Sequence, residues 1–86
     1  MKLNVYSMKD TKVGKFCRSF DAPNDEFAKE MLKNAVQKRD PKENVDLLAL
    51  YPEDFQLFKV ATFDEDTGVY TSEIKFIANA AEYKRG

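Results

Sequence analysis

The stretch FQLFKVATF DEDTG VYTSEIKFI, residues 55–77, places two runs rich in β-branched and aromatic residues on either side of a polar segment that ends in glycine. Such runs predict strands at 55–63 and 69–77, joined into a hairpin by residues 64–68. Gly68 suits the left-handed position of a three-to-five-residue hairpin loop. This hairpin is therefore the first fixed unit of the fold.

The position of Gly68 also predicts how the two strands of this hairpin are paired. The expected pairs are Thr62 with Ser72, Val60 with Ile74, and Phe58 with Phe76. Four apolar side chains then share one side of the hairpin. We expect that side to be the core face of the sheet, and its members are Phe58, Val60, Ile74 and Phe76.

A second hairpin is predicted at the start of the chain, over residues 2–20. Residues 2–8 and 15–20 have strand-like composition, and the segment 9–14 between them contains turn-forming residues and Gly14. The chain thus supplies four strands in two hairpins.

The segment between the hairpins predicts one amphipathic helix at 24–39. Asn24 can accept amide hydrogens of the first helical turn, and Pro41 disfavours helical geometry at the residue before it. One stripe of the helix is apolar and is expected to be buried. It consists of Phe27, Ala28, Met31, Leu32 and Ala35.

Two segments remain beside these elements. Residues 42–54 fit a short helix or an irregular apolar flap, of which we favour a helical turn, and the tail 78–86 forms a last helical turn or a frayed end. The order is β-β-α-β-β, which predicts an α+β fold in which two β-hairpins form a small antiparallel sheet packed against one amphipathic helix. Eighty-six residues make a single domain, 1–86.

Composition argues against several classes of function. The chain has one cysteine, Cys17, and no histidine, which excludes an internal disulfide framework and nearly every zinc, haem or iron–sulfur site. No glycine-rich phosphate loop and no nucleophile–base pair can be assembled, so we expect no enzyme, no cofactor and no metal. No apolar run approaches the roughly 20 residues of a membrane span, and no signal peptide opens the chain, so we expect an intracellular protein.

The net charge of −1 conceals a polarised chain. Residues 1–20 carry a net charge of +4, residues 21–52 carry −2, and residues 53–86 carry −3. The first hairpin is therefore a basic pole. Five cations beside one anion favour contact with a polyanion, although solubility alone is a use for such charge.

Aromatic residues alternate with these cations, which is typical of single-stranded nucleic-acid binding, because bases stack on aromatic rings while cations neutralise phosphates. Strand alternation places Lys2, Asn4, Tyr6 and Met8 on one face and allows residues 16, 18 and 20 to join them. The alternative is that the aromatic rings pack beneath the helix. The candidate nucleic-acid-binding residues are Lys2, Tyr6, Lys9, Lys12, Lys15, Phe16, Arg18 and Phe20.

Three stretches resemble one known family. The first is YPEDFQLFKVATFDEDTG at 51–68, with its PEDFxLF and FDxxTG elements. The second is LNVYS at 3–7, followed by Asp10, and the third is the helix entry Asn24-Asp25 with NAV at 34–36. Together they resemble the small nonstructural protein of microviruses, specifically the gokushovirus group of single-stranded DNA phages. The similarity extends to about Ser72.

The resemblance implies a phage protein made in the host cytoplasm, absent from the virion or minor there, that binds DNA during single-stranded genome synthesis or packaging. It supplies no binding residues. Two functions stay open: a single-stranded DNA-binding protein, or an interaction module that binds phage replication or capsid proteins or a host factor through the flap and the acidic hairpin. Pairing of two sheet edges would give a homodimer that presents two basic hairpins to one DNA strand.

Overall fold

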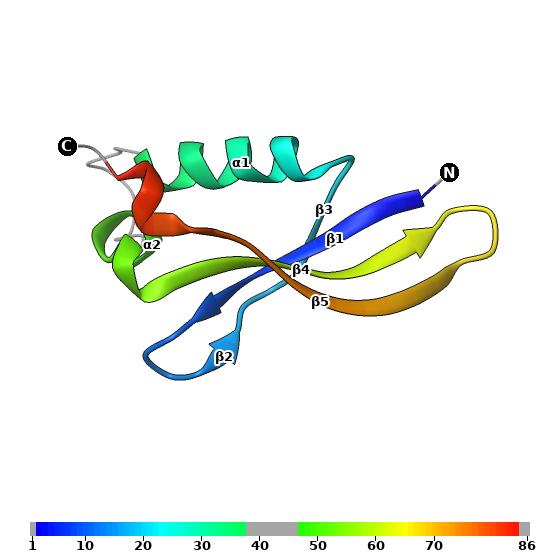
Figure 1. Ribbon diagram of the computed structural model, residues 1–86, viewed down its shortest axis with the longest axis horizontal. Coiled ribbons are helices and arrows are strands. Elements are labelled where there is room, and N and C mark those ends of the chain that lie inside the picture. The colour runs from blue at the N-terminus through cyan, green and yellow to red at the C-terminus, as the bar shows by residue number, and fades with distance from the viewer. Residues whose placement is uncertain (1, 38–46, 85–86) are drawn as a thin grey trace.

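The computed structural model describes residues 2–37 and 47–84 (Figure 1). The strands are β1 (Lys2–Asp10), β2 (Lys15–Phe16), β3 (Phe20–Ala22), β4 (Phe55–Asp64) and β5 (Val69–Asn79). The helices are α1 (Asp25–Gln37) and α2 (Leu47–Leu50), with 3-10 turns at Pro52–Asp54 and Ala80–Tyr83. The predicted helix residues 38–39, the flap residues 42–46 and the tail residues 85–86 lie outside the described residues.

The sheet is antiparallel, with the order β2-β1-β4-β5, and β3 pairs with the other half of the β1 edge that β2 occupies. The predicted α+β fold is confirmed: α1 lies across one side of a curled sheet (Figure 1). The prediction of one continuous strand at 15–20 is wrong, because residues 17–19 are not in a strand and separate β2 from β3. The chain stays attached there through the amide of Cys17, which donates to the carbonyl of Met8 at 2.7 Å.

Helix α1 begins as the sequence predicts. The side chain of Asn24 accepts a hydrogen bond from the amide of Phe27 at 2.8 Å, which satisfies a free donor of the first turn. The expected buried stripe is wrong at one border, because Phe27 and Met31 are 52% and 39% exposed. The buried residues of α1 are Ala28, Leu32 and Val36, so the stripe is rotated toward Val36.

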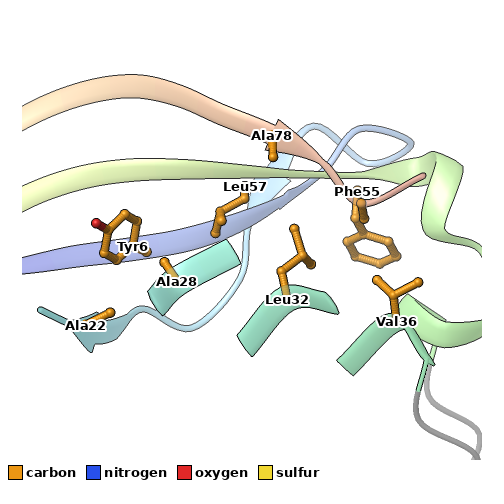
Figure 2. Packing of buried hydrophobic residues seen from close by; sticks show 9 residues of the cluster. Tyr6, Ala22, Ala28, Leu32, Val36, Phe55, Leu57 and Ala78 are labelled. Carbon is orange, nitrogen blue, oxygen red and sulfur yellow. The ribbon is translucent and has the colours of Figure 1, made fainter. Parts of the chain in front are cut away.

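The core lies between α1 and one face of the sheet (Figure 2). Tyr6 and Leu57 are its largest fully buried side chains. The cluster consists of Tyr6, Ala22, Ala28, Leu32, Val36, Phe55, Leu57, Ala78 and Ala80. Alanines contribute to the cluster from both layers, Ala28 from the helix and Ala78 from the sheet, beside the larger side chains.

The prediction that Phe58, Val60, Ile74 and Phe76 form the core face is wrong. Leu57 and Ala78 point toward the helix (Figure 2), so by strand alternation the side chain of Phe58 points to the opposite face. Ile74 and Phe76 are 64% and 48% exposed. The second hairpin is apolar on both faces, and the helix covers the face that carries Leu57 and Ala78.

The predicted register holds at one pair. Phe58 pairs with Phe76, whereas Thr62 pairs with Thr71 and not with Ser72. The register shift at Val60 causes the difference, and a second shift, between Leu57 and Phe58, lies on the other side of the Phe58 pair. Gly68 adopts the predicted left-handed conformation, with a φ of 76°.

The flap and the tail are compact where the structure describes them. The predicted helical turn is confirmed as α2 within the described part of 42–54. Tail residues 78 and 79 extend β5, and a 3-10 turn follows. This turn is capped at its start, because the amide of Asn79 donates to Glu82 at 2.8 Å.

Candidate functional site

Three phenylalanine rings cross the face of the sheet that α1 does not cover. Phe16 on β2, Phe58 on β4 and Phe76 on β5 form an aromatic row, with ring centroids 5.5 Å apart for the first pair and 5.7 Å for the second. Both pairs meet edge to face at 75°, which is a favoured aromatic geometry. Phe16 and Phe76, at the two ends of the row, are 45% and 48% exposed. The row is an accessible apolar surface.

A lysine lies directly on this aromatic row. Lys9 stands opposite Phe16 in the β1–β2 ladder, and its Nζ lies 5.6 Å from the centroid of the Phe16 ring. This is a cation–π distance. The arrangement puts a positive charge beside an exposed ring. The Lys9 ammonium can therefore bind an anion, and the Phe16 ring can stack on an aromatic partner.

The turn between β1 and β2 adds cations at the same end of the sheet. Lys12 and Lys15 are exposed, and Arg18 is exposed in the connection that follows β2. The acid of this hairpin, Asp10, is used locally: its carboxylate accepts hydrogen bonds from the amides of Lys12, at 3.0 Å, and Val13, at 3.4 Å. We call residues 9–18 the basic turn.

The opposite end of the sheet is acidic. We call residues 64–66 the acidic turn: Asp64 ends β4, and Glu65 and Asp66 follow it in the β4–β5 turn. Figure 1 shows this turn at the far end of the sheet from the basic turn. The described part of the molecule is 42 Å along its longest axis, so the two turns lie well beyond a Debye length of about 8 Å at physiological salt. Each turn therefore presents its own charge to a partner.

Lys2 is not part of the basic turn. It lies at the start of β1, where it pairs across the ladder with Asp64 of the acidic turn. The other predicted cations, Lys9, Lys12, Lys15 and Arg18, are brought together. Their closeness in the sequence suggested that all five cations form one group, but Lys2 and Lys9 lie toward opposite ends of the nine-residue strand β1.

The prediction that Tyr6 stacks on bases is wrong, because its ring is fully buried beneath α1. Its hydroxyl donates a hydrogen bond to Asp25 at 2.6 Å and accepts one from the side chain of Asn4 at 3.0 Å. Burial, and next the hydrogen bond to Asp25, raises the pKa of Tyr6 to about 12. Tyr6 ties the central strand to the start of the helix.

Phe20 also lies on the covered face. Its ring stacks on that of Tyr6 with centroids 5.8 Å apart, and it packs against the core. Of the three aromatic residues predicted to stack on bases, Phe16 alone is on the open face. For Tyr6 and Phe20 the structure shows the packing beneath the helix that was the alternative.

Sequence reasoning missed Phe58 and Phe76 as site residues because both were assigned to the core. The available signal was that the second hairpin carries bulky apolar residues on both faces, whereas one helix can cover a single face. A further aromatic pair, Phe63 and Tyr70, continues the open face toward the acidic turn, with centroids 4.6 Å apart. The open face thus has aromatic residues along most of the β4–β5 hairpin.

An apolar groove opens beside the helix, on the other layer of the molecule. Its volume is about 170 Å³, and its lining residues are Met8, Phe20, Met31, Leu32, Ala35 and Leu48. Leu50 and Tyr51 follow this lining along the chain and are each more than half exposed. The groove offers apolar contacts and no polar group.

Residues 2–37 and 47–84 contain neither a metal-binding cluster nor a membrane-spanning helix. Over these residues, no three of the cysteine, aspartate and glutamate side chains lie where they could hold a metal ion together. No helix in the same part of the chain has the length and apolar character needed to cross a bilayer.

The fold and the open face define a small α+β protein with an aromatic, partly basic surface on one side of its sheet. Comparison with known families then places the chain: it belongs to the Phage ORF5 protein family, whose pattern matches residues 3–83. The match extends beyond Ser72, where the resemblance in the sequence ended, into the last 3-10 turn. No curated protein and no solved structure matches the chain. The protein is thus a member of a bacteriophage family.

Proposed function

We propose that this protein is a nonenzymatic single-stranded DNA-binding protein of a microvirus of the gokushovirus group, acting in the host cytoplasm during genome replication or packaging. The observation that carries the proposal is the aromatic row of Phe16, Phe58 and Phe76 with Lys9 beside it. Membership of a bacteriophage family supports the setting.

The chemistry of the open face matches an unpaired strand better than a duplex. Unpaired bases expose their π-faces, and stacking on an aromatic side chain contributes about 1–3 kcal/mol per base. The bases of a duplex are already stacked and present only their edges in the grooves. Exposed rings at both ends of the row therefore favour a single strand.

The position of the charges indicates which part of the sheet the bound DNA strand crosses. The basic turn, residues 9–18, lies at the β2 end of the aromatic row, where cations neutralise phosphates as the bases cross toward β5. The acidic turn lies at the other end of the hairpin (Figure 1) and repels the backbone. We expect the strand to cross the sheet near the basic turn and to avoid residues 64–66.

A fluorescence anisotropy titration with a labelled 20–40-nucleotide strand tests this function. Binding is expected at low salt and to weaken steeply at moderate salt, with a logarithmic slope of about −3 for four phosphate contacts. Lys15→Glu should reduce both the affinity and that slope. Lys33→Glu, an equal charge change at an exposed position of α1, should lower the affinity less and is the matched control.

Competition with unlabelled nucleic acids completes the titration. Unlabelled single-stranded DNA is expected to displace the probe at lower concentration than duplex DNA, and an RNA strand tests whether the sugar is distinguished. If the strand does not bind even at low salt, or if Lys15→Glu and Lys33→Glu weaken binding equally, the proposed function is wrong.

The second candidate is an interaction module for phage replication or capsid proteins or for a host factor. The groove lined by Met8, Met31 and Leu48 favours it, because an apolar groove beside exposed Leu50 suits an apolar segment of a partner. In that case Met31→Asp abolishes partner capture and the DNA titration shows no binding.

A further inference from the structure

Strand β5 is the most exposed of the three long strands of the sheet. It forms one edge in the strand order, so its outer backbone edge has no strand partner within the described residues. Every residue from 69 to 76 is exposed, and this run includes Val69, Tyr70, Ile74 and Phe76. A long apolar edge strand is a template for pairing with another chain.

The charges on β5 are complementary to a second copy of the same strand. In antiparallel self-pairing centred on Ile74, Glu73 of one copy stands beside Lys75 of the other, and the reverse pair forms across the two-fold axis. Lys75 is exposed, and no ion pair of Lys75 is found within the described residues. Glu73 contacts Lys59 at 3.7 Å but stays 55% exposed, so it can receive a second cation.

We propose that two copies of this chain associate through the outer edge of β5, about a two-fold axis at Ile74, with Glu73 of each copy paired to Lys75 of the other. At this centre, Glu73 and Ile74 stand opposite the single residue Val60 of β4, which is a β-bulge. The bulge interrupts the regular ladder between β4 and β5 at this point. The register of the association is set by the two Glu73–Lys75 pairs that flank Ile74.

This association has a consequence for the open face. A two-fold axis perpendicular to the sheet keeps the open faces of both copies on the same side, so the two aromatic rows belong to one continuous surface. Ile74 of each copy lies between them. If the proposed DNA binding holds, the dimer offers one strand two binding sites, but the dimer itself forms without DNA and is measured without it.

Disulfide trapping tests the register. In a Cys17→Ser background, which removes the exposed native thiol, Ile74→Cys places two sulfhydryl groups at a self-paired position. Cα atoms of facing antiparallel residues are about 4.5–5.5 Å apart, within the range that a disulfide spans. Ile74→Cys should form a covalent dimer readily. Val13→Cys is the control and should not, although Val13 in the basic turn is 65% exposed.

Charge reversal tests the pairing without a cysteine, with sedimentation equilibrium as the readout. Lys75→Glu should raise the dimer dissociation constant on the order of tenfold, because it places like charges opposite each other twice. Adding Glu73→Lys to that variant should restore the dimer. Circular dichroism of each variant verifies that the fold is retained.

Three outcomes overturn the proposal. The first is a monomer at every concentration that sedimentation reaches, and the second is equal trapping of Ile74→Cys and Val13→Cys. The third is a dimer that resists Lys75→Glu and does not form the Ile74 disulfide, which indicates that the open faces stack on each other instead. None of these results depends on whether the protein binds DNA, so failure of this proposal and failure of the proposed function are separate.

Discussion

The two faces of the sheet differ although the same strands build them. On the face beneath α1, Leu57 is fully buried and the hydroxyl of Tyr6 is satisfied by Asp25. On the open face, Phe58 follows Leu57 directly in the sequence, yet it belongs to a row whose ends are nearly half exposed. Burial on the covered face stabilises the fold, whereas exposed aromatic rings on the open face contribute much less to stability. The open face is therefore the one that is free to bind a partner.

Removing a large side chain from each face gives the largest expected contrast. Leu57→Ala should lower the free energy of unfolding by about 2–5 kcal/mol, because it leaves a cavity in a close-packed core. Phe76→Ala should lower it by about 1 kcal/mol, because the ring is already 48% exposed. Urea unfolding monitored by circular dichroism measures both values. Equal losses would show that the open face is as structural as the covered one.

The aromatic row itself should matter for DNA. Phe16→Ala and Phe76→Ala should each weaken binding of a single-stranded oligonucleotide by about 1–3 kcal/mol, as expected for loss of one stacking ring. Phe27→Ala is the matched control, since Phe27 is 52% exposed on α1. Anisotropy titrations of the three variants separate the faces. A loss of affinity in Phe27→Ala as large as that in Phe16→Ala would contradict the assignment of the site.

The hydroxyl of Tyr6 provides a smaller test, restricted to the covered face. Tyr6→Phe removes the hydrogen bond to Asp25 and should lower the free energy of unfolding by about 1–2 kcal/mol at pH 7. Tyr70→Phe, at a position 64% exposed, should change it by less than about 0.5 kcal/mol. Chemical denaturation at pH 7 measures the difference between the two variants.

The same residue predicts a dependence of stability on pH. The pKa of Tyr6 is raised from 10.0 to about 12 in the folded protein, so the neutral phenol is favoured by folding. Its contribution is fully present below pH 10 and is lost as the pH rises toward 12. Between these values the wild-type protein should lose more stability than Tyr6→Phe. Parallel loss in both proteins would show that Tyr6 does not titrate in this way.

The smallest expected effect is at the end of β1. Lys2→Ala should change DNA affinity less than twofold, because Lys2 stands opposite Asp64 and is remote from the basic turn. Lys15→Ala should weaken binding more, since Lys15 begins β2 beside Phe16. Titrations of both variants at one low salt concentration compare the two ends of β1. Equal effects would mean that the bound strand extends over the whole sheet.

Local patterns predicted the elements of the fold well, because turns and caps depend on nearby residues. Gly68 adopts the left-handed conformation, and Asn24 caps α1 as expected. The predicted pair of Phe58 with Phe76 is observed, but only because the register shift at Val60 offsets a different pairing near the turn, where Thr62 stands opposite Thr71. The register of the whole hairpin was not predictable, because it changes at Val60 and again beside Leu57, and alternation of residue types marks neither shift.

The choice of face was the part that sequence could not decide. Both sides of the second hairpin are apolar, and alternation alone does not say which side the helix covers. The structure shows that Leu57 and Ala78 lie in the core beneath the helix, while the bulkier Phe58 and Phe76 pack on each other. Because the helix covers this face, Tyr6 and Phe20 pack in or against the core and not at the predicted site. Phe58 and Phe76 form the aromatic row with Phe16 on the open face.

Mapping of amide and aromatic chemical shifts by NMR, during titration with a short oligothymidine, tests the central claim most directly. The perturbed signals are expected to concentrate on Lys9, Phe16, Phe58 and Phe76, while residues of α1 such as Phe27 stay unchanged. Perturbations centred on α1 or on the groove beside Met31, with the aromatic row unaffected, would contradict the claim that the open face binds single-stranded DNA.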